Sequence, residues 1–206
     1  QNGITWTNCP GCNANSVVNY IHAVLTNLFL AEIQGKTVGI VGVGNVGGRV
    51  AQMAKSLGMN VLLNDPPRAA KEGAAGFVSL KEIQEKADII TFHVPLTPQT
   101  YHIVNDAFFF FFSLTPLIIN ADRGEVCSTE ALLTYPGEVV LDCWENEPTI
   151  SLPLLEKVAI GTPHIAGYSV DGKANGTRMA AEAVCKFFGI EKDIQIAVPG
   201  QIGIPY

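Results

Sequence analysis

The sequence predicts an α/β fold, a doubly wound parallel sheet with helices on both faces, and two observations support this prediction. Short apolar segments alternate along the chain with segments whose apolar residues recur at helical spacing. The apolar segments are nearly continuous in Val, Ile and Leu, which is typical of parallel strands buried on both faces. With 206 residues, of which 48% are hydrophobic, the chain can bury the core of such a sheet.

Six strands are expected, at residues 37–42, 61–64, 89–93, 117–120, 139–142 and 158–161. Helical spacing predicts one helix near 50–57, after the first strand, and another near 80–87, before the third. Two further apolar stripes at helical spacing, 17–28 and 179–187, lie outside this alternation. We interpret both as connections toward a second domain.

Composition argues against several classes of protein. A net charge of −6 argues against a nucleic-acid-binding protein, which needs a dense basic surface. No apolar run approaches the roughly 20 residues of a membrane span, and the sequence does not start like a signal peptide. Five cysteines, an odd number, fit a reducing compartment better than a disulfide framework. We therefore expect a cytoplasmic protein that binds neither nucleic acid nor membrane.

The first expected strand leads directly into G-x-G-x-x-G, formed by Gly42, Gly44 and Gly47. Such glycines allow a tight turn, close approach of a pyrophosphate and close packing of the next helix. Asp65 ends the second expected strand, at the distance of about 20 residues where a carboxylate can bind ribose hydroxyls. This predicts dinucleotide binding, with NAD preferred over NADP. Arg68 leaves that preference open, and Asp65 could instead only start the following turn.

Polar residues follow the later strands at their carboxyl ends, where open α/β sheets bind ligands. His164 and Glu147 could form an acid–base pair, and Arg123 could bind a carboxylate with two hydrogen bonds. Each residue alone could equally be structural or a surface residue. Their joint position beside a nucleotide loop favours the oxidation of an alcohol by hydride transfer, whereas His93 is better explained as structural or cofactor-adjacent.

At these residues the sequence resembles the D-isomer-specific 2-hydroxyacid dehydrogenases. The shared motifs are the glycine loop with Asp65, N-x-x-R-G at 120–124, D-x-x-x-x-E-P at 142–148 and P-H-x-A-G at 163–167. The resemblance implies that Arg123, Glu147 and His164 are catalytic, and that Arg123 and Tyr168 bind substrate. Besides the loop glycines Gly42, Gly44 and Gly47, it also implies contacts to NAD from Asn45, Val46, Asp65, Ala121, Asp122, Asp142 and Gly167.

Finer strings, such as P-G-C-N-A at 10–14 and D-P-P-R at 65–68, most resemble the erythronate-4-phosphate dehydrogenases within that family. This implies oxidation of 4-phospho-D-erythronate to 2-oxo-3-hydroxy-4-phosphobutanoate in pyridoxal phosphate biosynthesis, by a homodimer. A dehydrogenase of the phosphoglycerate or the glyoxylate/hydroxypyruvate type, or a non-catalytic NAD-binding sensor, remains an alternative.

The same resemblance predicts how the chain is divided. Residues 1–30 would hold a remnant of the substrate domain and an inter-domain helix, and 31–168 the dinucleotide-binding domain. Residues 169–206 would form a returning helix and a tail toward substrate and dimerisation domains that this sequence lacks. Five consecutive Phe at 108–112 replace an amphipathic helix of the family, which indicates either an error in the sequence or an exposed contact surface.

One motif points to a different function. C-P-G-C at 9–12 before a helix resembles a thiol–disulfide exchange site, because a helix start lowers the pKa of a cysteine. A thioredoxin fold needs a strand–helix–strand unit upstream, and a zinc site needs a second pair of ligands. Neither is found in this sequence, so redox and metal functions are disfavoured.

Overall fold

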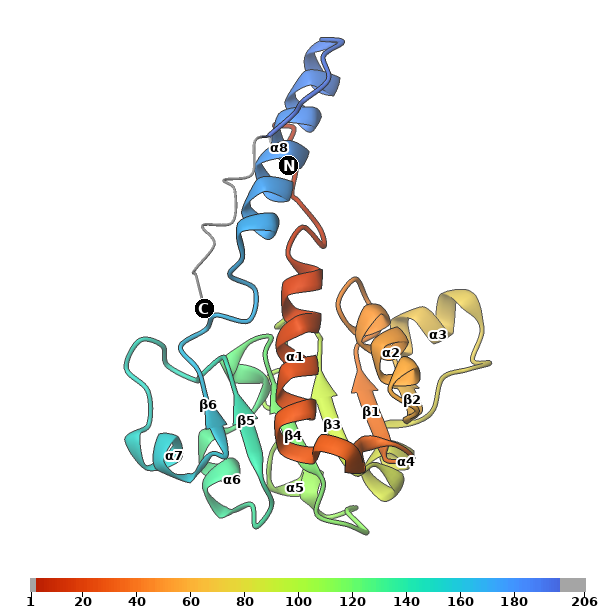
Figure 1. Ribbon diagram of the computed structural model, residues 1–206, viewed down its shortest axis with the longest axis vertical. Helices are drawn as coiled ribbons and strands as arrows, with labels where there is room; N and C mark the ends of the chain where they lie inside the picture. Colours follow the sequence, from red (N-terminus) through yellow and green to blue (C-terminus); the bar gives the residue numbers. More distant parts are fainter. Residues whose placement is uncertain (1–2, 197–206) are drawn as a thin grey trace.

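A six-stranded parallel sheet forms the centre of the computed structural model, which describes residues 3–196 (Figure 1). The strands are β1 (Thr37–Val41), β2 (Asn60–Asn64), β3 (Ile89–Phe92), β4 (Leu117–Asn120), β5 (Val139–Leu141) and β6 (Ile160–Gly161). Their order in the sheet is β2-β1-β3-β4-β5-β6, and every neighbouring pair is parallel. All six expected strands are present, so the predicted fold class is confirmed.

The order of the strands reverses beside β1. From β1 the chain crosses to β2 on one side, and then returns to pair β3 on the other side of β1. Such a reversal leaves a crevice outside the carboxyl ends of the two central strands, which is where doubly wound folds bind ligands. The glycine loop leaves β1 at this point, and His93 follows β3 at the same point.

Side chains alternate between the two faces of the sheet because successive residues of a strand point in opposite directions. Val38 and Ile40 of β1 belong to the core on the face covered by α1 (Ala14–Phe29) and α2 (Gly47–Ser56). Val41 belongs to the core on the other face. That face is covered by α4 (Leu80–Lys86), α5 (Asp106–Phe109), α6 (Thr129–Thr134) and α7 (Leu152–Lys157). The sheet is therefore covered on both faces.

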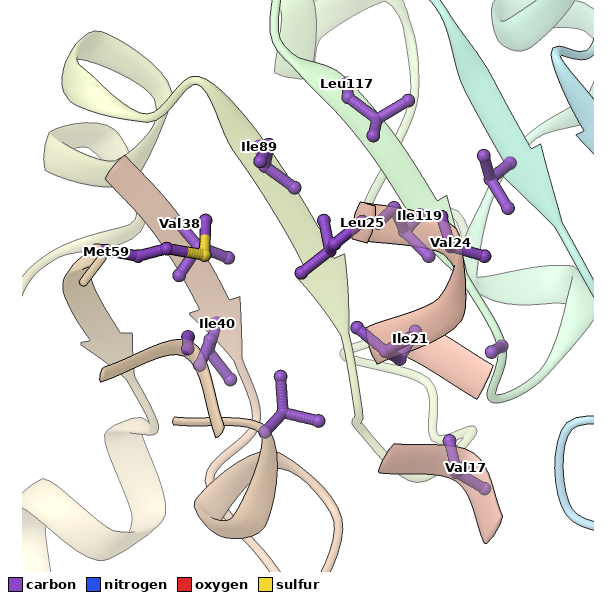
Figure 2. Close-up of a cluster of buried hydrophobic side chains, with 14 of the residues drawn as sticks. Val17, Ile21, Val24, Leu25, Val38, Ile40, Met59, Ile89, Leu117 and Ile119 are labelled. Atoms are coloured by element: carbon purple, nitrogen blue, oxygen red, sulfur yellow. The ribbon is translucent and has the colours of Figure 1, made fainter. Parts of the chain in front are cut away.

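The apolar stripe expected at residues 17–28 belongs to this core. Ile21 and Leu25 of α1 are fully buried and lie against Ile40, Ile89 and Ile119 of the sheet (Figure 2). The helix begins at Ala14, next to the candidate site, and runs down across the middle of the sheet (Figure 1). It is therefore a layer of this domain, and its role as a connection toward a second domain stays a prediction.

The second stripe lies on α8 (Val170–Phe188), which follows β6 and projects away from the sheet (Figure 1). Gly172 is its buried residue, whereas the side chains of Val184 and Phe187 are more than half exposed. The segment before α1 lies beside it, because the Cys9 thiol donates a hydrogen bond to the Gly176 carbonyl oxygen (3.2 Å). All five cysteines are free.

Short helices occur where no helix was predicted from apolar spacing. They are α3 (Pro66–Glu72), α5, α6 and α7, together with the 3₁₀ helices η1 (Leu30–Ile33) and η2 (Gly124–Val126). The five Phe at 108–112 are divided between core and surface: Phe108 is buried, whereas Phe110 and Phe111 are exposed, as expected for an outer face.

No helix in the described part of the chain has the length and apolar character needed to span a membrane.

Candidate active site at the carboxyl edge of the sheet

The glycine loop after β1 is shaped by contacts that exclude side chains. Gly42 has a φ of +88°, and a Cβ atom there would lie 2.2 Å from the His93 carbonyl oxygen. A Cβ at Gly47 would lie 2.0 Å from the Gly42 carbonyl oxygen, so α2 packs directly against the end of β1. At Gly44, no atom of the described residues lies within 4 Å of such a Cβ position. The loop is therefore tight at its base and open at its tip.

The amino end of α2, like that of α1, has no side-chain cap among the described residues. Six helices begin at a side chain that accepts a hydrogen bond from a first-turn N–H group: Asp65, Ser79, Asn105, Ser128, Ser151 and Ser169. At α2, no side chain within residues 3–196 does so. Free N–H groups and the helix dipole together favour an anion at such an end. The open tip of the glycine loop and this helix start fit the pyrophosphate of a dinucleotide.

Asp65 lies at the end of β2 beside this loop. One carboxylate oxygen accepts the Val43 N–H (2.8 Å), and the other accepts the Arg68 N–H (3.0 Å) and so caps α3. A carboxylate can accept about four hydrogen bonds, so both oxygens keep capacity for ribose hydroxyls. The Arg68 side chain pairs with Glu72 (2.7 Å) and donates to the Val43 carbonyl oxygen (2.6 Å). Asp65 thus both starts the following helix and faces the nucleotide loop.

Two cavities adjoin the glycine loop. The larger, about 810 Å³, is lined by Asp65 and by apolar residues such as Leu80, Val94 and Ile103. The smaller, about 260 Å³, is lined mainly by polar residues from the strand ends. Gly44 and His93 line both, so the cavities meet at the loop. An apolar cavity, an anion-binding loop and a polar cavity in this order fit adenosine, pyrophosphate and nicotinamide riboside.

His93 stands between the cavities, and burial lowers the pKa of its imidazole to about 4. The ring is therefore neutral near pH 7 and exchanges a hydrogen bond with the Thr91 hydroxyl (3.1 Å). A neutral histidine in hydrogen-bond contact with its own strand agrees with the structural or cofactor-adjacent interpretation given above.

Asp122 and Arg123 follow β4 and line the smaller cavity. Burial raises the pKa of Asp122 to about 6, although the nearby Arg123 charge opposes this. Among the described residues, its Oδ2 is a buried side-chain atom without a hydrogen-bond partner. A buried polar atom without a partner is unusual, and Asp122 belongs to the lining of the smaller cavity. The Arg123 side chain is exposed and donates to the Asp122 carbonyl oxygen (2.6 Å), and no other residue within 3–196 accepts a hydrogen bond from it.

His164 and Glu147 form a pair at the ends of β5 and β6. The imidazole Nδ1 lies 2.8 Å from Glu147 Oε2, and Glu147 Oε1 accepts the Trp144 N–H (2.6 Å). His164 has a φ of +55°, an unusual conformation for a residue with a side chain. With Nδ1 donating to the carboxylate, Nε2 carries the lone pair and can accept a proton.

The buried carboxylate of Asp142 explains how the His164 segment is held. It accepts hydrogen bonds from the Thr162 hydroxyl (2.6 Å) and from the N–H groups of Ile165 and Ala166 (2.8 Å each). Asp142 also lines the smaller cavity. Its carboxylate therefore positions the loop that carries His164, a role beyond the cofactor contact expected from the sequence.

Most of the residues expected at the site line the two cavities. The smaller cavity holds Gly44, Asn45, Val46, Ala121, Asp122, Arg123, Asp142, His164 and Gly167, and the larger holds Gly42, Gly44 and Asp65. Gly47 lies behind the loop, and Glu147 contributes through His164. Tyr168 is largely exposed, with the Lys173 ammonium 3.6 Å from its ring centre, so its role in substrate binding stays a prediction.

Sequence reasoning missed several residues of this region. Asn13, which precedes α1, and Val17 of α1 line the smaller cavity, and Asn13 Nδ2 donates to the Gly167 carbonyl oxygen (3.3 Å). The only available signal was the position of the helix start. A second histidine–carboxylate pair, His102 with Glu145, was also missed, although Glu145 lies in the same segment as Glu147.

Ligand atoms of Cys143, Glu147 and His164 lie within 4.8 Å of one another, which is a spacing a metal ion could use. Burial and the neighbouring carboxylates raise the pKa of the Cys143 thiol well above its ordinary value. The thiol is therefore protonated at neutral pH and donates a hydrogen bond to the Asp122 carbonyl oxygen (3.4 Å). A protonated thiol does not favour a metal ion, since metals bind the thiolate.

Comparison with known proteins identifies the family. Residues 20–166 match the family described as D-isomer specific 2-hydroxyacid dehydrogenase, NAD binding domain. The chain belongs to this family. The resemblance noted from the motifs is thereby confirmed, and the cofactor of the matched domain is NAD.

Named relatives and solved structures in the family show the extent of the similarity. Erythronate-4-phosphate dehydrogenase of Bacteroides fragilis is 53% identical over 96% of this chain and 60% of the relative. The protein of the same name from Porphyromonas gingivalis is 46% identical over 93% and 55%. D-lactate dehydrogenase of Aquifex aeolicus, solved with NAD and lactic acid, superposes with a TM-score of 0.71 at 25% identity, covering 86% of this chain and 67% of that one. The chain thus spans 55% to 60% of the length of these two curated relatives.

Proposed function

We propose that the protein oxidises the hydroxyl group of a D-2-hydroxy acid with NAD⁺, and that its substrate is 4-phospho-D-erythronate. The observation that carries the chemistry is the His164–Glu147 hydrogen bond of 2.8 Å at the edge of a cavity shared with the glycine loop. The choice of substrate is supported by two erythronate-4-phosphate dehydrogenases that are 46% and 53% identical to the chain.

In this proposal His164 removes the hydroxyl proton of the substrate at Nε2. Glu147 holds Nδ1–H and stabilises the imidazolium that forms, as a carboxylate does in other histidine-based catalysts. NAD⁺, when bound, supplies the acceptor for the hydride. The Asp142 carboxylate fixes the His164 segment through two backbone N–H groups, so the imidazole stays at the edge of the cavity.

Arg123 binds the substrate carboxylate. Its guanidinium lies at the cavity wall with N–H groups that no described residue occupies beyond the Asp122 backbone contact. This would orient the carbon that bears the hydroxyl group between Arg123 and His164. Tyr168, beside Lys173, would bind the phosphate end of the substrate.

The cofactor groups follow the order of the two cavities. Gly42, Gly44, Asn45, Val46 and Gly47 would form the pyrophosphate loop, and Asp65 would bind the ribose of the adenosine half. Ala121, Asp122 and Gly167, which line the smaller cavity with Asp142, would contact the nicotinamide half. The protein would work as a homodimer in the cytoplasm, in pyridoxal phosphate biosynthesis. The five free thiols support a reducing compartment.

The test uses the protein at its natural length with NAD⁺ and 4-phosphoerythronate. NADH should form, and faster than with 3-phosphoglycerate or glycerate at equal concentration. The variant His164→Asn should lose at least about 100-fold in kcat because the base is removed. Its affinity for NADH should stay within about twofold, since this side chain lies at the rim of the cavity.

His22→Asn is a matched control, because His22 is an exposed histidine of α1 away from both cavities. It should keep full activity. Absence of NADH formation by the parent protein with all three substrates, despite normal NADH binding, would favour the alternative of a non-catalytic NAD-binding protein.

A further inference from the structure

A second histidine–carboxylate pair lies behind the site. His102 Nε2 is 2.6 Å from Glu145 Oε1, and both side chains are largely buried, with 28% and 14% of their surface exposed. Neither residue lines the two cavities described above. The pair therefore contacts neither cavity directly, and its effect on the chemistry would have to pass through the backbone.

Glu145 joins three loops that each carry part of the site. Its Oε2 accepts the N–H of Thr129, the first residue of α6, at 3.0 Å. His102 comes from the loop after β3. Its backbone N–H donates to the carbonyl oxygen of Glu125 (2.8 Å), which lies in the loop after β4. Desolvation raises the pKa of Glu145, but the hydrogen bonds from Thr129 and His102 outweigh it, so the pKa lies below its ordinary value. Glu145 is thus held as a carboxylate between these loops.

The loop fixed by Glu145 is the one that presents Glu147. Only Asn146 separates the two carboxylates, and its φ of +63° turns the chain between them. The backbone of Trp144 donates to Glu147 Oε1 (2.6 Å). At Gly124 the chain is so close that a Cβ would lie 2.0 Å from the Trp144 carbonyl oxygen. The backbone at 144–146 therefore sets where the Glu147 carboxylate lies.

We infer that His102 and Glu145 are positioning residues, which lock the 143–148 loop so that Glu147 meets His164 Nδ1. This inference deepens the function proposed above and rests on it. The two acidic residues of this loop would then have different roles. Glu145 would anchor the loop to the body of the domain, and Glu147 would bind Nδ1 of the catalytic histidine. Catalysis would depend on His102 although it lies outside both cavities.

The kinetic test uses the protein at its natural length. Glu145→Ala, and His102→Leu, which removes the donor at similar size, should lower kcat by about tenfold, because a small displacement of a catalytic group costs this much. His102→Gln keeps an N–H donor for Glu145 and should restore kcat to within about twofold of the parent. NADH affinity should stay within about twofold in every variant.

Ser128→Ala is the matched control for a merely structural effect. Ser128 caps the same helix α6 through the Ala131 N–H (3.4 Å) and does not contact the 143–148 loop through a hydrogen bond. It should destabilise α6 and leave kcat unchanged. A kcat that falls as far in Ser128→Ala as in Glu145→Ala would overturn the inference, as would parental kcat in both Glu145→Ala and His102→Leu.

A spectroscopic readout separates this inference from the proposed function. Trp144 is 5% exposed within the loop, and Trp6 is the other tryptophan of the chain. In a Trp6→Phe background, acrylamide quenching of Trp144 should increase by about twofold or more in Glu145→Ala and stay unchanged in Ser128→Ala. A parent without turnover would defeat the proposed function only. Unchanged quenching in Glu145→Ala and His102→Leu would defeat the inference, whether or not the protein is active.

Discussion

Backbone atoms form the candidate site at the glycine loop, whereas side chains from separate segments form it at the ends of β5 and β6. At the loop, added Cβ atoms at Gly42 and Gly47 would lie 2.2 Å and 2.0 Å from carbonyl oxygens. At the other end, Asp142 and Glu147 hold His164 and its loop by side-chain hydrogen bonds. The first half depends on residues that lack side chains, and the second on polar side chains that follow two neighbouring strands.

The largest effect is expected at Gly42. Gly42→Ala places a Cβ 2.2 Å from the His93 carbonyl oxygen at a φ of +88°, so it should lower the free energy of unfolding by about 3 kcal/mol or more. Gly44→Ala meets no atom within 4 Å and should change stability by less than about 1 kcal/mol. It should nevertheless weaken NADH binding, because its methyl group occupies the open tip.

Urea denaturation and titration calorimetry with NADH measure these two effects separately. Equal stability losses in both variants would show that the loop is not tight at its base. Unchanged NADH affinity in Gly44→Ala would show that the dinucleotide does not approach the backbone there, and would remove the contrast between the two halves.

An intermediate effect is expected at Asp142, the buried carboxylate of the second half. Asp142→Asn replaces one acceptor oxygen by an NH₂ group that faces a donor, so we expect a loss of about 2 kcal/mol in the free energy of unfolding. Asp88→Asn is the matched control, since Asp88 accepts a single backbone N–H, from Thr37. Denaturation that gives equal losses for both would mean that the three bonds to Asp142 do not hold the His164 segment.

The effect expected at Asp122 depends on pH and is smallest in acid. Because its pKa is raised to about 6 in the folded protein, the folded state binds the proton more tightly than the unfolded state does. The carboxylate therefore costs stability increasingly as the pH rises from about 4 to above 6, by up to about 3 kcal/mol. Asp122→Asn should remove this loss. Urea denaturation of parent and variant at pH 4, 5, 6 and 7 should show a difference that grows with pH; a constant difference would contradict the assignment.

The two halves also differ in how far the sequence predicts them. The strands and the glycine loop are local patterns: β3 and β4 are apolar runs buried on both faces, and each was expected within a residue of its observed bounds. The short helices were missed because each has fewer than two full turns of apolar spacing. The caps Asn105, Ser128 and Ser151 were the available signal for three of them.

In the second half, the sequence predicts which residues follow strands, but not which of them meet. The positions of Glu147 and His164 after neighbouring strands indicate proximity, and the structure gives their hydrogen bond. The His102–Glu145 pair joins residues 43 positions apart from two loops whose paths no local pattern determines. The sequence predicts only a cofactor contact for Asp142. Nothing in the sequence shows that three donors from residues 162–166 surround its carboxylate.

The two ends of the sheet unit lie side by side next to the site, and this affects how such a domain can be moved between proteins. Asn13 at the start of α1 bonds to Gly167, Ser16 bonds to Ala166, and the family match covers residues 20–166. The chain thus enters and leaves the sheet unit at one place, on the side of the active site. A unit with adjacent ends can be inserted into a host chain as a cassette without stretching either junction. Residues 13–167 would be the segment to transplant when a new substrate-binding partner is to be attached to this cofactor-binding scaffold.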